Sequence, residues 1–234
     1  MNFLNYEDFL DNLERLRSRI AAACSVATRP ADAVRILAVT KTHPIDAALY
    51  AMHAGLAGAG ENRVQEALEK IAMCTEPGVK WELIGHLQSN KAAKAAVAFA
   101  RIQSLDRMDL AQKLDRTAAT AGRVLPVLLQ INAGDDPAKF GANCADAPAL
   151  MEAVLKCASL KVEGLMTIAP LAPGNPSIVR RCFARLRETR DALAAKFNTP
   201  LPELSMGMSD DLESAVAEGS TLVRVGSALF GKRG

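Results

Sequence analysis

The chain of 234 residues alternates short strand-like runs with longer helix-like segments, and this alternation constrains its fold more than any other feature. The strand-like runs are residues 35–41, 56–60, 80–85, 101–105, 124–131, 161–168, 203–206 and 221–225. The helix-like segments between them are residues 45–54, 62–73, 89–98, 107–121, 146–158, 177–197 and 210–218. Such alternation is typical of an α/β fold with a parallel sheet, and eight strands predict a closed (β/α)8 barrel of the TIM type.

An extra element precedes the first predicted strand. Apolar residues recur at helical spacing from Phe9 to Ile20, which predicts an amphipathic N-terminal helix that ends before Pro30. The length is close to the roughly 250 residues of a typical barrel, so we expect one domain, residues 1–234, without a second β domain. The run 56–60 is the weakest, because small residues form strands poorly, and an open doubly wound sheet remains the alternative.

Charge and composition limit the kinds of partner. The chain has 28 Lys and Arg against 26 Asp and Glu, with both signs interspersed, so there is no basic stripe for nucleic acid or for a membrane surface. The five cysteines form no C-x-x-C pair, and the acidic residues near the start do not resemble a signal peptide. We therefore expect a cytoplasmic, monomeric protein whose partner is a small molecule.

Lys41 is the first candidate for chemistry. It ends the first predicted strand, and the C-terminal ends of the strands form the functional face of such barrels. Loss of hydration there would lower the pKa of its amine and let it attack an aldehyde, although a lone lysine in this place more often extends into solvent. Ring closure favours the functional interpretation, because the eighth strand must then bring Arg224 and the Gly226-Ser227 pair beside Lys41.

A phosphate cradle is expected near Lys41, because phosphate sites in these barrels favour the loops after strands seven and eight. Gly207 and Gly226 would let backbone N–H groups approach an anion closely. The hydroxyls of Ser205, Ser209 and Ser227 would add donors. An amine that seeks an aldehyde and a site for phosphate would then share one pocket.

Two carboxylates in the same loop have a competing interpretation. Asp210 and Asp211 precede a predicted helix and would repel a phosphate placed directly on its positive end. With Glu213 three residues after Asp210, the spacing resembles a capping box. We therefore expect the phosphate nearer Gly226 and Ser227.

Other common sites find no support. The three histidines, His43, His53 and His86, show no spacing that would build a metal site, although His43 and His86 follow strand ends and could line the rim. No G-x-S-x-G elbow is present, and no G-x-G-x-x-G follows a predicted strand. Neither a metal centre, nor a hydrolase triad, nor a dinucleotide site is predicted.

Several motifs occur in one order along the chain and together carry a family resemblance. They are Val39-Thr40-Lys41-Thr42, Gly60-Glu61-Asn62, residues 84–91 (IGHLQSNK), Gly164-Leu165-Met166, residues 205–211 (SMGMSDD) and Arg224-Val225-Gly226. With these motifs, the chain resembles the pyridoxal 5′-phosphate (PLP) homeostasis proteins from about residue 37 to 231. The resemblance implies a barrel of the fold type III PLP-binding kind, like the N-terminal domain of bacterial alanine racemases.

The resemblance also implies roles for particular residues. Lys41 would hold PLP as a Schiff base, Arg224 would face the pyridine nitrogen, and Asn62 would lie close to the ring. Met166 and Gly207 are further expected contacts within the matched motifs, and Ser205, Ser209, Gly226 and Ser227 are the expected phosphate contacts. Members of the family are regarded as carriers or regulators of PLP that affect vitamin B6 and amino-acid balance, so PLP-dependent apo-enzymes are the expected protein partners.

Three residues depart from the family pattern. Arg63 stands where the family often has Tyr, Glu82 where His is common after the Trp, and Ser227 where Thr is frequent. Ser227 keeps the hydroxyl. Arg63 and Glu82 are expected to alter the outer rim and any surface for a partner.

Three functions are weighed against one another. A non-catalytic PLP carrier is favoured, because Arg224 would keep the pyridine nitrogen unprotonated and weaken carbanion stabilisation. The first alternative is a weak racemase with Lys41 as its single base, since Tyr6 and Tyr50, the only tyrosines, fall in predicted helices where packing is the expected role. The second alternative is a Schiff-base aldolase of sugar phosphates, whose weak point is placement, because such an enzyme needs an acid or base near the lysine on neighbouring strands.

Overall fold

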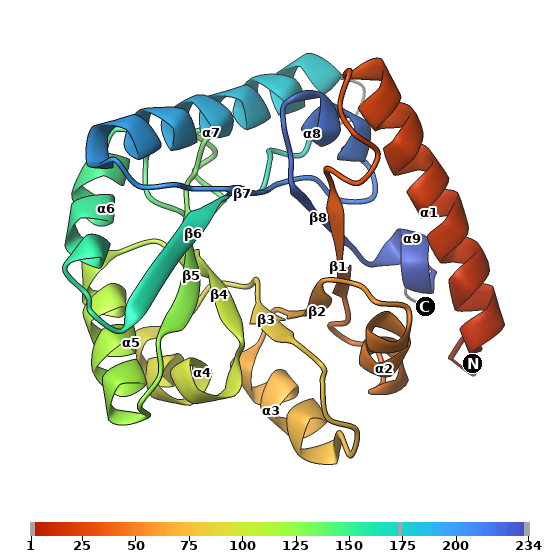
Figure 1. Cartoon of the computed structure of the whole chain (residues 1–234), viewed down its shortest axis with the longest axis horizontal. Helices are drawn as coiled ribbons and strands as arrows, with labels where there is room; N and C mark the ends of the chain where they lie inside the picture. The colour runs from red at the N-terminus through yellow and green to blue at the C-terminus, as the bar shows by residue number, and fades with distance from the viewer. Residues whose placement is uncertain (1–2, 173–174, 232–234) are drawn as a thin grey trace.

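The eight predicted strands form a closed ring of parallel strands in the computed structural model, which describes residues 3–172 and 175–231 (Figure 1). The strands are β1 (Arg35–Val39), β2 (Gly58–Glu61), β3 (Trp81–Leu83), β4 (Arg101–Leu105), β5 (Leu125–Gln130), β6 (Leu160–Met166), β7 (Glu203–Ser205) and β8 (Leu222–Val225). Each strand pairs in parallel with its neighbours in chain order, and β8 pairs with β1. The (β/α)8 barrel is thereby confirmed, and the open doubly wound sheet is wrong.

Helices alternate with the strands and lie outside the ring (Figure 1). They are α2 (Asp46–His53), α3 (Val64–Met73), α4 (Ala92–Ala98), α5 (Met108–Thr120), α6 (Ala147–Leu155), α7 (Pro176–Phe197), α8 (Leu212–Ala217) and α9 (Ser227–Phe230). The segment predicted as one helix over 89–98 begins instead with a 3-10 turn, η1 (Ser89–Lys91). The predicted domain, residues 1–234, includes residues 1, 2, 173, 174 and 232–234, which lie outside the described part of the chain.

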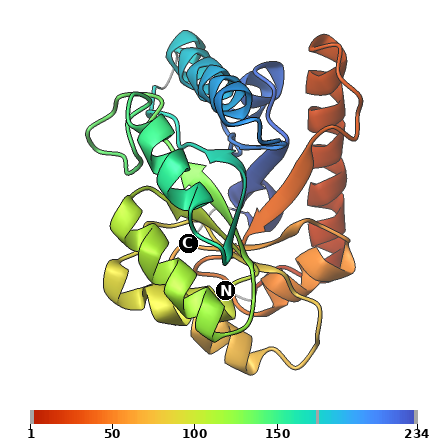
Figure 2. The ribbon, with the colours of Figure 1, turned by 60° about the vertical axis from the view of Figure 1, so that its left-hand side comes forward.

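The predicted N-terminal helix is present as α1 (Tyr6–Val26). Its Asn5 cap accepts a hydrogen bond from the backbone of Asp8 at 2.8 Å, which satisfies one free N–H of the first turn. The buried face carries the predicted stripe, Phe9, Leu13, Leu16 and Ile20. This face packs on α8 and α9, so α1 covers the outside of the seam between β1 and β8 (Figure 2).

The apolar core lies mainly between the ring of strands and the helices. Inside the ring, Leu37, Ile84 and Leu222 pack together, and since β1 and β3 are not neighbours this contact crosses the barrel interior. Apolar side chains fill only part of that interior. Buried charged and amide side chains, among them Glu82, Arg101 and Gln103, occupy another part of it and bond to one another.

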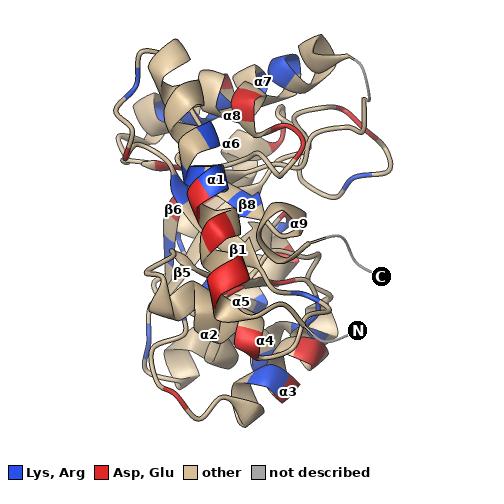
Figure 3. Ribbon diagram, turned by 90° about the vertical axis from the view of Figure 1, so that its right-hand side faces the viewer, with Lys and Arg blue, Asp and Glu red and all other residues tan. Residues whose placement is uncertain are grey.

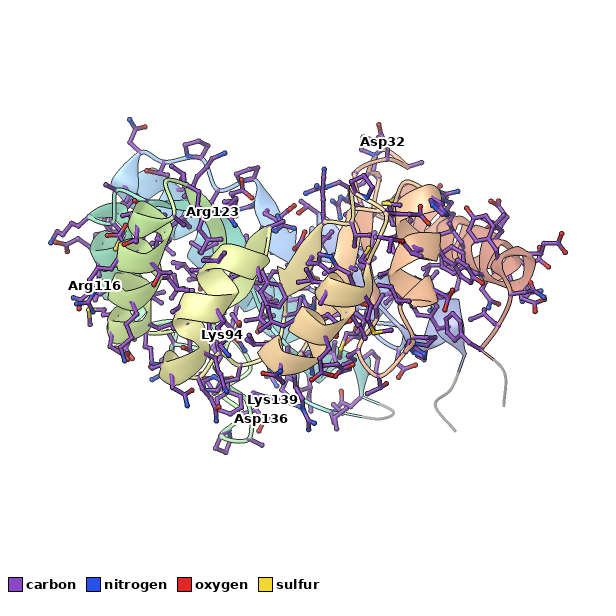
Figure 4. All side chains as sticks on the ribbon, turned by 90° about the horizontal axis from the view of Figure 1, so that it is seen from below. Asp32, Lys94, Arg116, Arg123, Asp136 and Lys139 are labelled. Atoms are coloured by element: carbon purple, nitrogen blue, oxygen red, sulfur yellow. The ribbon has the colours of Figure 1, made fainter. Side chains whose placement is uncertain are left out.

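The two ends of the barrel are distinct. Asp32 and Arg123, which precede β1 and β5, lie at one end, whereas Asp136 and Lys139, which follow β5, lie at the opposite end (Figure 4). The second end therefore carries the segments that follow the strands.

The face around α1 shows both signs of charge interspersed rather than one charged stripe (Figure 3). Among the described helices, none is long and apolar enough to cross a membrane.

Two strand boundaries matter for the site. β1 ends at Val39 rather than at Lys41, so Lys41 lies in the turn beyond the strand. β2 runs from Gly58 to Glu61 rather than from 56 to 60, so Glu61 belongs to the strand instead of following it. The strand starts late because the N–H of Leu56 is bound to Ala51 O at the end of α2.

Candidate functional site

Lys41 lies at the seam where the barrel closes. The N–H of Thr40 still bonds to Gly60 O at 3.0 Å, and the half-buried Lys41 follows directly. On the other side of the seam, Leu37 is in register with Arg224. Gly226 therefore lies beside Val39, where a Cβ on the glycine would come within 3.2 Å of Val39 O. The predicted pairing of the first and eighth strands is confirmed, and Lys41 follows the end of β1.

Two predicted hydroxyls meet on the same side of the barrel mouth. Ser227 Oγ donates to Ser209 Oγ at 3.0 Å, and the N–H of Ala228 lies 3.4 Å from Ser209 Oγ. Ser209 is half-buried and Ser227 is exposed, so both are accessible to a ligand. The loop after β7 and the loop after β8 thus present hydroxyl donors next to Gly226.

Arg224 is buried near the end of β8, with 4% of its surface exposed. Its guanidinium donates to Ser205 Oγ at 2.8 Å and to Thr167 O at 2.7 Å. Burial lowers the pKa of Arg224 to about 10, with the charge of Asp211 acting in the opposite direction, so the group remains a cation at neutral pH. A guanidinium has five N–H donors and no acceptor, so it can only donate to a ligand.

A chain of hydrogen bonds supports Arg224 from inside the barrel. We call it the barrel-interior chain, and it consists of Arg101, Glu82, Gln103, Ser205 and Arg224. Arg101 binds Glu82 through two nitrogens, at 2.8 and 3.1 Å. Gln103 Nε2 donates to Glu82 at 2.6 Å, and Ser205 Oγ donates to Gln103 Oε1 at 2.6 Å. Since β4 and β7 are not neighbours, the bond from Ser205 to Gln103 crosses the interior.

The direction of the hydrogen bonds from Gln103 to Arg224 is fixed by Glu82. Because the carboxylate of Glu82 can only accept, the amide of Gln103 must turn its NH2 group toward it and its oxygen toward Ser205. Ser205 must then donate to Gln103, which leaves a lone pair on its oxygen for Arg224. The chain thereby orients the guanidinium.

Three of the predicted contacts, Ser205, Gly207 and Met166, are buried in this structure. Ser205 has no exposed surface and uses its hydroxyl on Gln103 and Arg224, so in this structure it is not available to a phosphate. Gly207 is buried at φ +98°, and a Cβ there would lie 2.5 Å from Ala215 of α8, so the glycine serves close packing and a left-handed turn. Met166, the last residue of β6, is fully buried.

Two interpretations of acidic residues are wrong. Glu82 does not lie at the outer rim, because it is 5% exposed and pairs with Arg101 inside the barrel. The capping box is absent: α8 begins at Leu212, and the side chain of its cap residue Asp211 accepts instead from the N–H of Met208 at 2.5 Å. Glu213 pairs with Arg19 of α1 at 2.8 Å.

A second polar network, which was not predicted from the sequence, lies behind the turn that carries Lys41. We call it the strand-end cluster, and it consists of Thr40, Glu61, Glu66 and Lys70. Lys70 Nζ lies 2.8 Å from Glu61 Oε1 and 3.1 Å from Glu66 Oε1. A signal was present in the sequence, because Lys70 continues the buried stripe of α3 formed by Val64 and Ala67. A lysine on an apolar stripe requires a buried partner.

The remaining candidates lie around the same end of the barrel. Asn62 is half-buried and directly follows β2. His86 stacks on Phe140 with ring centroids 3.9 Å apart, and its Nδ1 lies 3.4 Å from an Asp106 carboxylate oxygen. His43 lies against Phe230, with ring centroids 5.0 Å apart. Arg63 is exposed at the start of α3, at the outer edge where the sequence placed it.

Comparison with known proteins identifies relatives of full length. Residues 12–234 match the family described as alanine racemase, N-terminal domain. The pyridoxal phosphate homeostasis protein of Pseudomonas aeruginosa is 42% identical over 95% of this chain and 95% of its own, and that of Aquifex aeolicus is 40% identical over 95% and 97%. The structure of PipY of Synechococcus elongatus with PLP bound aligns with a TM-score of 0.83 at 39% identity, covering 95% of this chain and 100% of PipY. The chain therefore belongs to the alanine racemase N-terminal domain family and, within it, to the pyridoxal phosphate homeostasis proteins.

Proposed function

We propose that this protein binds PLP as a Schiff base on Lys41 and takes part in the intracellular homeostasis of PLP and amino acids. The observation that carries the proposal is the closing seam, where Lys41, the buried Arg224 and the paired hydroxyls of Ser209 and Ser227 come from segments far apart in the chain. The PLP-bound relative PipY supports the same ligand.

The side chains at the seam fit the parts of PLP. The half-buried Lys41 offers an amine for the aldehyde, and loss of water accompanies the new C=N bond. Arg224 can only donate, which suits a pyridine nitrogen that acts as an acceptor. Ser209, Ser227 and the backbone at Gly226 suit the phosphate, and the half-buried Asn62 after β2 would lie close to the ring. Ser205 does not contact PLP in this proposal but accepts a hydrogen bond from Arg224 and so orients its guanidinium.

A carrier suits these residues better than an enzyme. PLP acts in enzymes as an electron sink, which is strongest when its pyridine nitrogen is protonated, and an arginine donor opposes that protonation. The tyrosines do not supply the missing base. The ring centroids of Tyr6 and Tyr50 lie 5.0 Å apart between α1 and α2, in an aromatic cluster outside the barrel. We therefore propose that a monomer in the cytoplasm exchanges PLP with PLP-dependent apo-enzymes and has no strong turnover of its own.

The absorbance spectrum of the purified protein with PLP tests this proposal. We expect a visible band from the lysine Schiff base, and peptide mapping after borohydride reduction should place the adduct on Lys41. Lys41→Ala should abolish the band, whereas Lys156→Ala, an exposed lysine on the outside of the barrel, should keep it. Absence of the band from the wild-type protein would contradict PLP binding.

A second assay separates the carrier from a weak racemase. Exchange of the Cα hydrogen of alanine or serine for deuterium, measured against a control with PLP alone, should show no rate attributable to the protein. Exchange at a catalytic rate that Lys41→Ala removes would overturn the carrier and establish the racemase.

A further inference from the structure

We infer that the strand-end cluster is a positioning device, which holds the main chain on both sides of Lys41 so that this lysine alone reaches the aldehyde. The inference rests on the proposed function. It assigns a role to Glu61, Glu66 and Lys70, none of which is proposed to touch PLP.

The bonds of the cluster flank Lys41 on both sides. Before it, Thr40 Oγ1 donates to Glu61 Oε1 at 2.7 Å, and Thr40 O accepts from Lys70 Nζ at 2.8 Å. After it, the N–H of Thr42 donates to Glu66 Oε1 at 2.5 Å. The turn is therefore tied to β2 at one side and to α3 at the other.

The turn needs this support because its backbone is strained. Thr42 has φ +65°, a left-handed conformation that a β-branched residue rarely adopts. Such a conformation persists only where surrounding contacts determine it. The bond from the N–H of Thr42 to Glu66 is one such contact, and it fixes the direction in which the preceding Lys41 leaves the strand.

Lys70 joins the two sides of the turn into one unit. Its ammonium has three N–H donors, and three acceptors surround it: Thr40 O, Glu61 Oε1 and Glu66 Oε1. Burial of Lys70 and Glu61, at 8% and 0% exposure, makes loss of any member costly for the others. Because these three acceptors occupy its donors, the Lys70 side chain is held within the cluster and does not compete with Lys41 for an aldehyde.

Variants at Thr40 and Lys70 test the inference through PLP binding. Thr40→Val removes the hydroxyl that binds Glu61, and Lys70→Met removes the ammonium while keeping an unbranched side chain. For both we expect slower formation of the Schiff-base band and PLP affinity weaker on the order of tenfold, because hydrogen bonds to charged groups are lost. Thr40→Ser keeps the hydroxyl and should restore wild-type behaviour.

Leu114→Ala serves as the matched control for stability. Leu114 is fully buried in α5, away from β1 and β2, so its truncation should lower the unfolding temperature while the folded protein binds PLP normally. Measurements are made well below the unfolding temperature of every variant. Equal losses of PLP affinity in Leu114→Ala and Lys70→Met would overturn the inference, because the effect would then be one of general stability.

Peptide mapping measures which lysine PLP labels, and a purely structural role of the cluster would leave that site unchanged. In Lys70→Met and Thr40→Val, borohydride should trap PLP at Lys41 in lower yield per folded molecule, with part of the label on other lysines. Wild-type yield, rate and site in both variants would overturn the inference and leave the proposed function intact. Failure of the wild-type protein to form the band would instead remove the proposed function itself.

Discussion

The barrel-interior chain and the strand-end cluster are both buried, and both combine cations with carboxylates, but they act on different parts of the site. The barrel-interior chain lies inside the ring of strands, links strands that are not neighbours, and ends on the side chain of Arg224. The cluster lies outside the ring, between two strand ends and α3, and ends on the backbone around Lys41. One network orients a side chain, whereas the other holds a turn.

The two networks also differ in how their charges are compensated. In the interior, Arg101 lies between Glu82 and Glu203, a carboxylate that adjoins the barrel-interior chain, and Arg35 adds a second cation at Glu203. Glu163 lies 3.4 Å from Arg101 and pairs in turn with Lys161. In the strand-end cluster a single Lys70 faces both Glu61 and Glu66. The interior therefore approaches charge balance, while the cluster carries an excess of carboxylate. Substitutions should affect stability most in the interior.

The largest expected effect is that of Arg101→Met. It leaves Glu82 and Glu203 buried without their common partner, and breaking a buried pair in this way costs about 3–5 kcal/mol. Urea unfolding measures the loss. Lys156→Met breaks a pair with Glu152 in which both side chains are mostly exposed, and it should cost less than about 1 kcal/mol. Equal losses in the two variants would mean that the interior ion pairs contribute no more than surface ones.

A smaller effect is expected for Ser205→Ala. The substitution removes a donor to Gln103 and an acceptor for Arg224, which should cost about 1–3 kcal/mol because buried polar groups lose partners. PLP should also bind more weakly, since the guanidinium is then held only by Thr167 O among the acceptors described above.

Ser209→Ala is the matched control for Ser205→Ala. Ser209 lies on the loop, half-buried, and its hydroxyl meets Ser227 rather than the interior. Stability should change by less than about 0.5 kcal/mol, while PLP affinity falls through the loss of a phosphate donor. Unchanged stability in Ser205→Ala would show that the Ser205 hydroxyl does not stabilise the barrel-interior chain.

Local pattern and ring closure allowed the fold and the seam to be predicted from the sequence. The spacing of Phe9 and its apolar partners defines one face of α1 whatever the rest of the chain does. A ring of eight strands brings the end of β1 beside the end of β8 without any knowledge of side-chain packing, and this is the part of the site that the sequence predicted.

The two networks could not be predicted in the same way. Arg101 and Glu203 are 102 residues apart, and they meet only because the register of β4 and β7 turns both into the interior. The direction of Ser205 depends on the same register, so its bonds to Gln103 and Arg224 could not be predicted from its place at a strand end. Lys70 was detectable in principle, as a charge on an apolar stripe, but its partner Glu61 was expected after the second strand, whereas it is the last residue of β2.

The smallest expected difference, in the pH dependence of stability, has opposite signs at Glu203, which adjoins the barrel-interior chain, and at Glu61 of the strand-end cluster. Burial alone would raise the pKa of Glu203, but hydrogen bonds from Thr221, Arg101 and Arg35 outweigh it and lower that pKa. Burial is the dominant cause for Glu61 and raises its pKa, despite Lys70 and Thr40. Glu203 is therefore more acidic in the folded chain than in the unfolded chain, and Glu61 is less acidic.

Free energies of unfolding of Glu203→Gln and Glu61→Gln, followed from neutral to acidic pH, test this contrast. A lowered pKa gives stability that is present above the unfolded pKa and is lost as pH falls through the folded one, so Glu203→Gln should lose least stability on acidification. A raised pKa gives stability that is present at low pH and is lost as pH rises through the folded pKa. The free energy of unfolding of Glu61→Gln should therefore increase relative to that of the wild type as pH rises toward neutral. Parallel pH profiles for the two variants would show that the carboxylates have the same environment, and the contrast between a balanced interior and a carboxylate-rich cluster would not hold.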